Sequence, residues 1–289
     1  HRDLHSFPTR RSSDLGKIIL DPPVEIDDLT TLISSLSKNQ YSWVVGVGGG
    51  RIMDISKHVA SKLKAKLCLI PTALSTTAWL NMAIALRRNG TLHFPGQKHA
   101  DIALIDPILI IQSPTYLSLG GIADVLCSVS AMTDWKLGYE NNGEKYSEDA
   151  YSAYRALIEE TIRDLSKLKP FNETAIKNEI EIFLDSLALC GAALSGRPLE
   201  GSEHFLYYCI DEKSKTPIIH GGLIALGILI SLRLQGEDAM LKPEVMKNFF
   251  DQAGINYRLG ELKLSKDIFS QALAEMPEFV KLRNLPYSI

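Results

Sequence analysis

The sequence has few features of a membrane, secreted or nucleic-acid-binding protein. Its longest apolar stretch, Gly221 to Leu232, is too short to span a bilayer, and its four cysteines form no CxxC pair. A formal net charge of −3 provides no strong field to hold a polyanion. We therefore expect a cytoplasmic protein with reduced thiols that binds neither nucleic acid nor membranes.

The first fifteen residues differ in character from the rest of the 289-residue chain. They contain neither the apolar core of a secretion signal nor any periodicity. They resemble the translation of a sequencing adapter. We expect residues 1–15 to be a non-native segment and the true beginning of the protein to be missing.

Short β-rich runs alternate with helical runs from Gly16 to about residue 112. This alternation is typical of βαβ units and a parallel sheet. The strand-like runs are 17–20, 43–47, 66–70, 92–94 and 102–105, and the helical runs are 25–36 and 51–63. We predict an α/β dinucleotide-binding domain over residues 16–112, with the runs at 92–94 and 102–105 as a ribbon or edge strands.

Strand-like runs disappear after Pro114, and long helical patterns replace them. The expected helices span 122–139, 151–168, 174–194, 202–210, 223–234 and 243–253. The second predicted domain, residues 113–289, is therefore entirely helical.

A glycine-rich turn joins the strand-like run 43–47 to the helical run that follows. Gly48, Gly49 and Gly50 let a ligand phosphate approach the backbone, and the helix directs free N–H groups and a partial positive charge at it. Three adjacent glycines are not a GxGxxG fingerprint, so a simple tight turn is the alternative.

One carboxylate and two imidazoles form a candidate metal site. We expect Asp124 in the first turn of a helix that begins near Gly120, and His204 and His220 at the starts of two successive helices. Such a set suits Zn²⁺ or Fe²⁺ with one coordination position left open for catalysis. A helix-start acid and a buried core histidine are the structural alternatives, and Asp134 is a rival ligand. The glycines after His220 would leave room for a ligand.

Five segments in this order resemble a known family: GVGGGRIMDISK, PTALST, GGIADVL, GSEHFLYY and HGGLIALG. Together they are similar to the metal-dependent polyol dehydrogenases of the dehydroquinate-synthase-like fold, which include glycerol-1-phosphate dehydrogenase and the iron-containing alcohol dehydrogenases. The resemblance implies an α/β nucleotide-binding domain followed by a helical metal-binding domain, and a homo-oligomer. In this family a first strand-helix unit, with an acid that reads the adenosine ribose, would precede residue 16.

The resemblance also implies roles for individual residues. The pyrophosphate of NAD or NADP would bind at Gly48, Gly49, Gly50 and Asp54, while Thr72 and Ser75 would line the nicotinamide side. The metal, Zn²⁺ or possibly Fe²⁺, would bind Asp124, His204 and His220. Lys57 matches the family pattern as well, although a solvated helix charge explains it equally.

Three substrate positions depart from the pattern of glycerol-1-phosphate dehydrogenases. Thr77 replaces an aspartate, Asn81 a serine, and Tyr208 a histidine one helical turn after the metal histidine. A carboxylate that could accept a hydrogen bond from a glycerol hydroxyl is therefore absent. Three arginines, Arg197, Arg87 and Arg88, are candidates for holding the anionic end of a phosphate substrate.

We expect a metal-dependent NAD(P)-linked oxidoreductase that acts on a small polyol or polyol phosphate. Three alternatives stay open: a dehydrogenase of the same fold for glycerol or another alcohol, a cyclase like dehydroquinate synthase, and a non-catalytic truncated homologue. The neutral segment 76–80 argues against the cyclase, whose family has a longer basic signature there.

Overall fold

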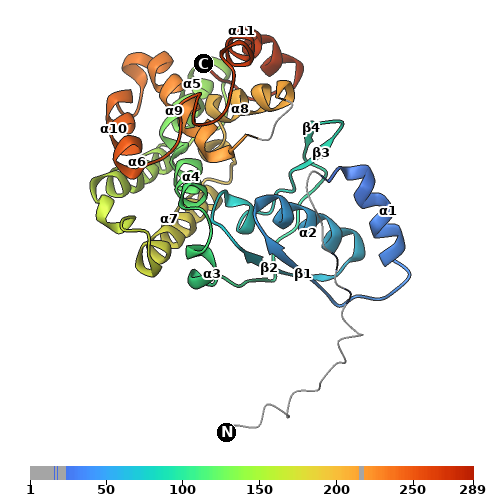
Figure 1. Ribbon diagram of the computed structural model, residues 1–289. Coiled ribbons are helices and arrows are strands. Elements are labelled where there is room, and N and C mark those ends of the chain that lie inside the picture. Colours follow the sequence, from blue (N-terminus) through green and yellow to red (C-terminus); the bar gives the residue numbers. More distant parts are fainter. Residues whose placement is uncertain (1–15, 17, 19–23, 215–217) are drawn as a thin grey trace.

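The computed structural model describes residues 16, 18, 24–214 and 218–289. The predicted strand at 17–20 and the segment 1–15 lie outside these residues. Figure 1 shows an α/β part, formed by the blue and cyan elements, against which a larger helical part packs. The fold class expected from the sequence agrees with this arrangement of a small parallel sheet followed by many helices.

The α/β part contains a three-stranded parallel sheet in the order β1-β2-β5. These strands are β1 (Trp43–Gly48), β2 (Lys66–Pro71) and β5 (Ile102–Ala103). Helix α2 (Gly50–Leu63) connects β1 to β2, and α1 (Ile26–Leu36) packs on α2. Because Gly48 pairs with Pro71, both strands end at the same edge of the sheet, where α2 begins.

Among the described strands, β1 lies at the edge of the sheet and has one apolar face open to solvent. Val45 and Val47 are each 55% exposed. Alternate residues of a strand point to opposite faces, so the other face carries Val44 and Gly46. That second face packs against α2, where Gly46 must lack a side chain because a Cβ would lie 2.2 Å from the Ser56 Oγ.

An antiparallel ribbon leaves the sheet and reaches the helical part. Its strands are β3 (Leu86–Arg88) and β4 (Thr91–His93), which confirms the ribbon expected near 92–94. A single 3₁₀ turn, η3 (Thr77–Trp79), lies between β2 and β3.

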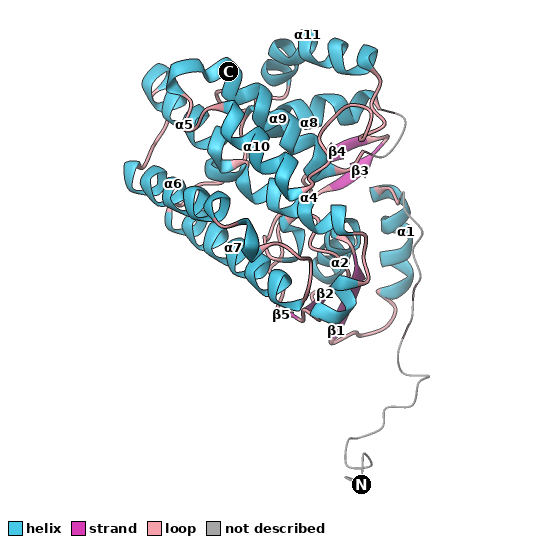
Figure 2. Cartoon of the chain, turned by 60° about the vertical axis from the view of Figure 1, so that its left-hand side comes forward, coloured by secondary structure: helices cyan, strands magenta, loops and turns pink. Residues whose placement is uncertain are grey.

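Figure 2 shows the helical part above and to the left of the sheet. Its longer helices are α4 (Thr115–Leu126), α5 (Ser128–Asn142), α6 (Glu148–Arg163), α7 (Glu173–Ala192), α8 (Ser202–Lys213), α9 (His220–Gln235), α10 (Pro243–Ala253) and α11 (Lys266–Leu282). Short turns are α3 (Pro107–Ile111), η4 (Leu165–Lys167), η5 (Arg197–Leu199) and η6 (Gly236–Asp238).

The single helix predicted over 122–139 is wrong, because two helices meet at Cys127. The first of them begins at Thr115, directly after Pro114, seven residues before the predicted start. At the junction Ser128 and Ser130 donate their hydroxyls to the carbonyls of Val125 and Cys127. Such side-chain bonds to the backbone compete with the regular helical ladder. Helices α3 and α11 were not predicted.

One hydrophobic core joins the two parts of the protein. Leu67 and Leu69 of β2 belong to the same buried cluster as Ile122 of α4 and Ile224 of α9. Helices α4 and α5 together, Thr115–Asn142, are long and apolar enough to cross a membrane, but 83% of their most apolar window is buried inside the protein. Their hydropathy is therefore that of core helices.

Candidate metal and nucleotide site

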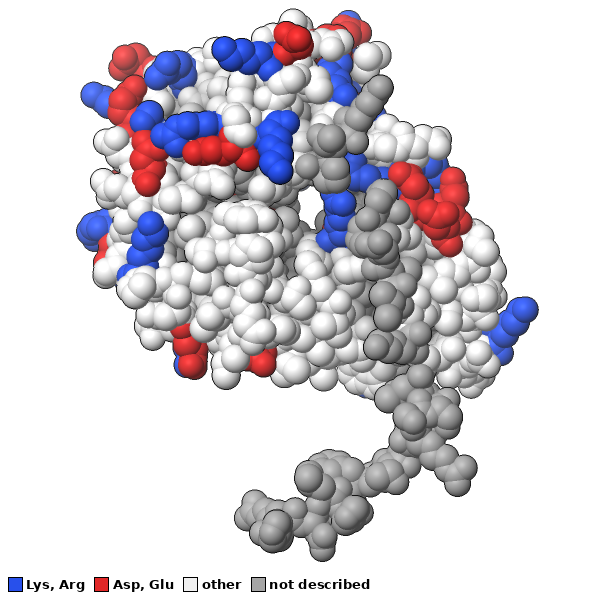
Figure 3. All heavy atoms as spheres, in the orientation of Figure 1, with Lys and Arg blue, Asp and Glu red and all other residues white. Residues whose placement is uncertain are grey.

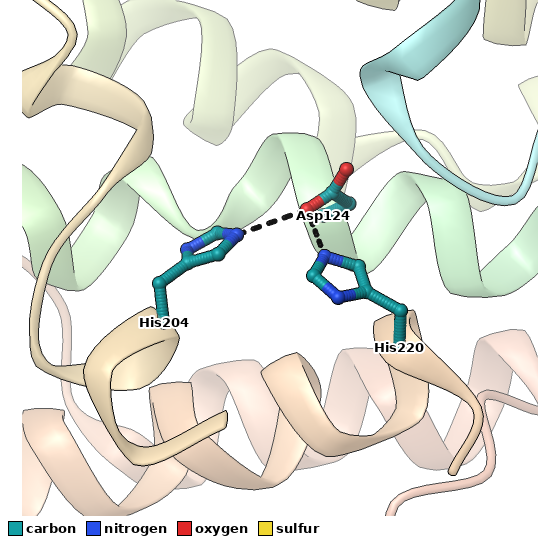
Figure 4. Close-up of side chains that lie close together, drawn as sticks. All are labelled: Asp124, His204 and His220. Carbon is teal, nitrogen blue, oxygen red and sulfur yellow. Dashed lines mark hydrogen bonds and ion pairs between the residues drawn. The ribbon is translucent and has the colours of Figure 1, made fainter. Parts of the chain in front are cut away.

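Asp124 lies at the centre of the candidate metal site and contacts both histidines. Its Oδ1 is 2.9 Å from Nε2 of His220 and 3.3 Å from Nε2 of His204 (Figure 4). Its Oδ2 accepts a hydrogen bond of 3.0 Å from the backbone N–H of Thr77. The structure thus brings together all three residues that the sequence singled out.

The expected position of Asp124 in the first turn of a helix is wrong. Because α4 begins at Thr115, Asp124 lies in its third turn, near the C-terminal end. The partial charge of a helix C-terminus is negative, so the macrodipole does not explain a buried carboxylate there. His204 and His220, in contrast, begin α8 and α9 as predicted.

Two glycines bring α4 and α9 close enough for Asp124 and His220 to meet. A Cβ on Gly221 would lie 1.9 Å from the carbonyl oxygen of Gly120. Gly120 is one helical turn before Asp124, and Gly221 follows His220 directly. Gly221 therefore makes room for a helix crossing and Gly222 for the carbonyl of Asn256, and not for a ligand as the sequence suggested.

The two histidines differ in their surroundings. The His204 side chain is 9% exposed and its Nδ1 lies 3.1 Å from Oε1 of Glu203, which is fully buried. The His220 side chain is 22% exposed and meets the ring of Tyr207 edge-on, with centroids 4.4 Å apart. A carboxylate at Nδ1 favours the tautomer that presents Nε2 of His204 to Asp124.

Electrostatic interactions within the cluster outweigh the effect of burial. Burial raises the pKa of Asp124, but His220 and His204 together hold this pKa below its usual range. Burial likewise lowers the pKa of His204, yet its hydrogen bonds to Asp124, Cys127 and Glu203 keep that pKa well above the usual value. The site therefore holds an ionised carboxylate against two imidazoles.

The donor set fits a divalent metal ion. One ligand atom from each of Asp124, His204 and His220 lies within 4.8 Å of the other two. Two imidazole nitrogens and one carboxylate oxygen are the ligands that Zn²⁺ and Fe²⁺ accept in sites that keep an open position. The chemistry of the donors does not separate these two metals.

A cavity of about 450 Å³ connects the metal cluster with the start of α2. Figure 3 shows a hollow near the middle of this face, with basic side chains at its edge. The predicted site residues that line the cavity are Gly50, Asp54, Ser75, Thr77, Asn81, Asp124, His204, Tyr208 and His220. The others, Gly48, Gly49, Thr72 and Arg197, do not line it.

At two of the three positions in the glycine-rich turn, glycine is required because neighbouring side chains leave no room for a Cβ. A Cβ on Gly48 would lie 2.7 Å from Ile52, and one on Gly50 would lie 2.7 Å from the Thr76 Oγ1. Nothing lies within 4 Å of a Cβ at Gly49, so the space beside the first turn of α2 is open. Free N–H groups at a helix start beside open space can receive an anion.

Lys57 is not a solvated helix charge. Its side chain is fully buried, and its Nζ lies 2.7 Å from Oδ1 of Asp54. The ammonium group also donates to the carbonyl of Ala83 and, at 3.4 Å, to the side chain of Asn81. Burial raises the pKa of Asp54 even though Lys57 opposes this shift. Lys57 therefore connects α2 to the segment before β3 and holds the side chain of Asp54, which lines the cavity.

Arg197, a candidate for holding the anionic end of a phosphate substrate, does not line the cavity. It donates to Glu144 at 3.1 Å, to the carbonyl of Glu200 at 3.2 Å and to the carbonyl of Tyr287 at 2.7 Å. These bonds tie η5 to the C-terminal segment outside the cavity. A substrate phosphate would have to displace all of them, so Arg197 has a structural function.

Two other candidate arginines lie on the ribbon. Arg88 is exposed and pairs with Asp27 at 3.4 Å. Arg87 lines the cavity and forms a bidentate ion pair with Asp211 of α8, at 2.5 and 2.7 Å. Arg87 therefore ties the ribbon to the helix that carries His204.

Sequence reasoning missed Arg51, Glu203 and Phe94. Arg51 follows Gly50 in the first turn of α2, lines the cavity, and has no hydrogen-bond or ion-pair partner among residues 24–214 and 218–289. Its place after the glycines was a visible signal. Glu203 was equally visible as the neighbour of His204, whereas nothing in the sequence links Phe94 to α8.

Comparisons with known proteins agree with this arrangement. Residues 4–114 match the family model of iron-containing alcohol dehydrogenases. The chain is 31% identical over 271 residues to glycerol-1-phosphate dehydrogenase [NAD(P)+] of Caldivirga maquilingensis, covering 89% of this chain and 74% of that protein. It is 29% identical over 235 residues to the enzyme of the same name from Thermoplasma acidophilum, covering 81% of this chain but only 65% of the relative.

A solved structure supports the same fold. NADH-dependent butanol dehydrogenase A of Thermotoga maritima matches with a TM-score of 0.65 at 14% identity, over 89% of this chain and 73% of that one. The chain therefore belongs to the iron-containing alcohol dehydrogenase family. Within that family it is similar to the glycerol-1-phosphate dehydrogenases.

Proposed function

We propose that this protein transfers hydride between NAD(P) and a small polyol or polyol phosphate with the help of a metal ion. The observation that supports this most directly is that Asp124, His204 and His220 share one cavity with the first turn of α2. An oxidoreductase of this kind must place its nucleotide and its metal within reach of the same substrate carbon. Curated relatives named glycerol-1-phosphate dehydrogenase [NAD(P)+] support the same reaction.

Asp124 Oδ1 and the Nε2 atoms of His204 and His220 would hold the metal, which we propose to be Zn²⁺, with Fe²⁺ as the alternative. A bound divalent ion supplies Lewis-acid stabilisation of developing negative charge on an alcohol oxygen. The protein contributes orientation. The Thr77 N–H fixes the Asp124 carboxylate, and Glu203 fixes the His204 ring.

The start of α2 would receive the nucleotide. The free N–H groups after Gly49 suit a pyrophosphate, and Ser75 lines the same cavity as the metal cluster. Asp54, held by Lys57, lines the same passage. These groups leave both NAD and NADP as cofactors.

The substrate would lie between the metal cluster and the ribbon, in contact with Thr77, Asn81 and Tyr208. Arg51 and Arg87 are the cations that line the described cavity, and Arg51 is the one without a carboxylate partner. We therefore propose Arg51 for an anionic substrate group. A cytoplasmic homo-oligomer is the assembly that the family resemblance favours.

The test follows oxidation of NADH and NADPH by the Zn²⁺-loaded protein, with dihydroxyacetone phosphate in one reaction and dihydroxyacetone in the other. Turnover that is lost on metal chelation, and lost in His204→Ala while that variant still binds nucleotide by calorimetry, supports the proposal. Turnover retained by His204→Ala removes the metal from the mechanism. Formation of dehydroquinate indicates the cyclase, and metal binding without nucleotide binding indicates a non-catalytic homologue.

A further inference from the structure

The wall of the cavity beside His204 is aromatic. The Tyr208 ring is 6.2 Å from the His204 ring and 6.1 Å from the ring of Phe94, between centroids. Tyr207 lies 5.7 Å from Tyr208 and packs edge-on against His220. All three aromatic residues line the cavity. A substrate held at the metal cluster would therefore face the aromatic rings of these residues on the side next to His204.

The hydroxyl of Tyr208 is directed out of the cavity. It donates a 2.8 Å hydrogen bond to Oε1 of Glu200, and Glu200 does not line the cavity. A single proton already donated to Glu200 cannot be donated to a substrate.

The two polar side chains opposite this wall are engaged with the protein as well. Asn81 Nδ2 donates to Thr77 Oγ1 at 2.8 Å, and Asn81 Oδ1 accepts from Lys57 at 3.4 Å. Neither residue carries a charge that could hold a substrate hydroxyl. A hydroxyl placed between this pair and the aromatic wall would thus lose its water and gain at most the hydroxyl proton of Thr77.

The aromatic wall is also fixed in position. Phe94 follows β4 directly. The bidentate pair of Arg87 with Asp211 holds the ribbon against α8, and the ribbon lies beside α8 in both Figure 1 and Figure 2. Asp211 is buried, and Arg–carboxylate pairs of this geometry are specific in direction. The ring of Phe94 therefore stays beside Tyr208.

We propose that the substrate carries a short apolar group, such as a methyl, directly on the reacting carbon, and that this group packs against Tyr208 and Phe94. This inference rests on the proposed function. Its substrate class is a hydroxyketone phosphate with one apolar end, reduced to the corresponding diol phosphate. A hydroxyl in place of the methyl hydrogen should lower kcat/KM by about tenfold to a hundredfold.

The test compares two ketones that differ by one oxygen atom, hydroxyacetone phosphate and dihydroxyacetone phosphate. We expect the wild-type protein to prefer hydroxyacetone phosphate. Tyr208→Phe keeps the ring and should keep that preference, whereas Tyr208→His introduces a free donor and acceptor and should shift the ratio toward dihydroxyacetone phosphate by about tenfold. Phe94→Ala, at a residue that is 54% exposed, should reduce the preference.

A wild-type preference for dihydroxyacetone phosphate, or a ratio unmoved by Tyr208→His and Phe94→Ala, would overturn the proposal. A calorimetric titration of the metal- and NAD⁺-loaded protein separates this failure from failure of the proposed function. If neither ketone is reduced, tighter binding of propane-1,2-diol 1-phosphate than of glycerol 1-phosphate still supports the apolar subsite. Equal or weaker binding of the propanediol phosphate, or none, overturns it.

Discussion

Replacing Gly221 with alanine tests whether the glycine crossing builds the metal site. The new Cβ would lie 1.9 Å from the Gly120 carbonyl oxygen, and Cβ contacts below 3.0 Å are essentially never seen in proteins. The helices α4 and α9 must therefore separate by at least about 1.1 Å, which is roughly twice the ~0.5 Å tolerance of a functional constellation. We expect a loss of about 1–3 kcal/mol in the free energy of unfolding, as for other overpacked cores.

The same movement would separate Asp124 from His220, now 2.9 Å apart, so metal affinity should fall by at least the ~10-fold effect of a disturbed ligand shell. Gly120→Ala is the matched control from the other side of the crossing. Its Cβ would be 3.5 Å from the Gly221 Cα, an ordinary contact, so this variant should keep both properties.

Denaturant unfolding of the metal-free protein and competitive titration with a zinc chelator measure the two effects independently. If Gly221→Ala matches Gly120→Ala in both experiments, the crossing does not position the ligands and the reasoning is refuted. A loss of stability without a loss of metal affinity would show that the helices separate without moving Asp124.

Two further predictions concern buried charges away from the cavity. Arg197→Met should lower the free energy of unfolding by about 2–3 kcal/mol, because Glu144 and two carbonyls lose a charged donor, while KM for substrate stays unchanged. The control is Lys177→Met, which breaks only an exposed pair with Glu173. A changed KM in Arg197→Met would contradict the structural function. Burial, and then the nearby Glu203, raise the pKa of Asp134 from 3.8 to about 6, so the folded state binds a proton that the unfolded state releases. The free energy of unfolding should therefore fall by about 3 kcal/mol as pH rises from below 3.8 through 6. Asp134→Asn should flatten this part of the curve of unfolding free energy against pH. An equally steep curve for the variant would show that other groups cause the slope.

Patterns local in sequence predicted most of the secondary structure. The alternation of β-rich and helical runs located β1, α2 and β2 to within a residue or two, because burial of one face imposes that period directly. Helix starts were less certain. The glycines predict a start near Gly120, although Pro114, six residues earlier, is the stronger start signal for α4.

The candidate site was predictable where its chemistry depends on residue type. Asp124, His204 and His220 stand out as potential ligands, and the structure brings them together. The failures involve contacts across the chain. Nothing near Arg197 reveals its bond to the carbonyl of Tyr287, ninety residues later, which turns a candidate substrate residue into a structural one.

Lys57 is a different kind of failure, because its partner was visible. Asp54 lies one helical turn earlier, and such pairs are usually exposed and weak. The pair of Lys57 with Asp54 is buried only because α2 packs against the segment before β3. The sequence does not show that this segment covers the helix there.

The open face of β1 affects how this chain behaves at high concentration. Val45 and Val47 lie on an edge strand whose outer N–H and C=O groups face no neighbouring strand among the described residues. An edge of this kind can act as a template for another extended segment, which would pair with β1 and extend the sheet and its apolar face. Since α2 packs on the other face of β1 and no residue of β1 lines the cavity, such an association would remove protein from solution while leaving each copy's cavity accessible. Solubility and activity of this protein are therefore separable properties, and a charged residue at position 45 would improve the first without altering the second.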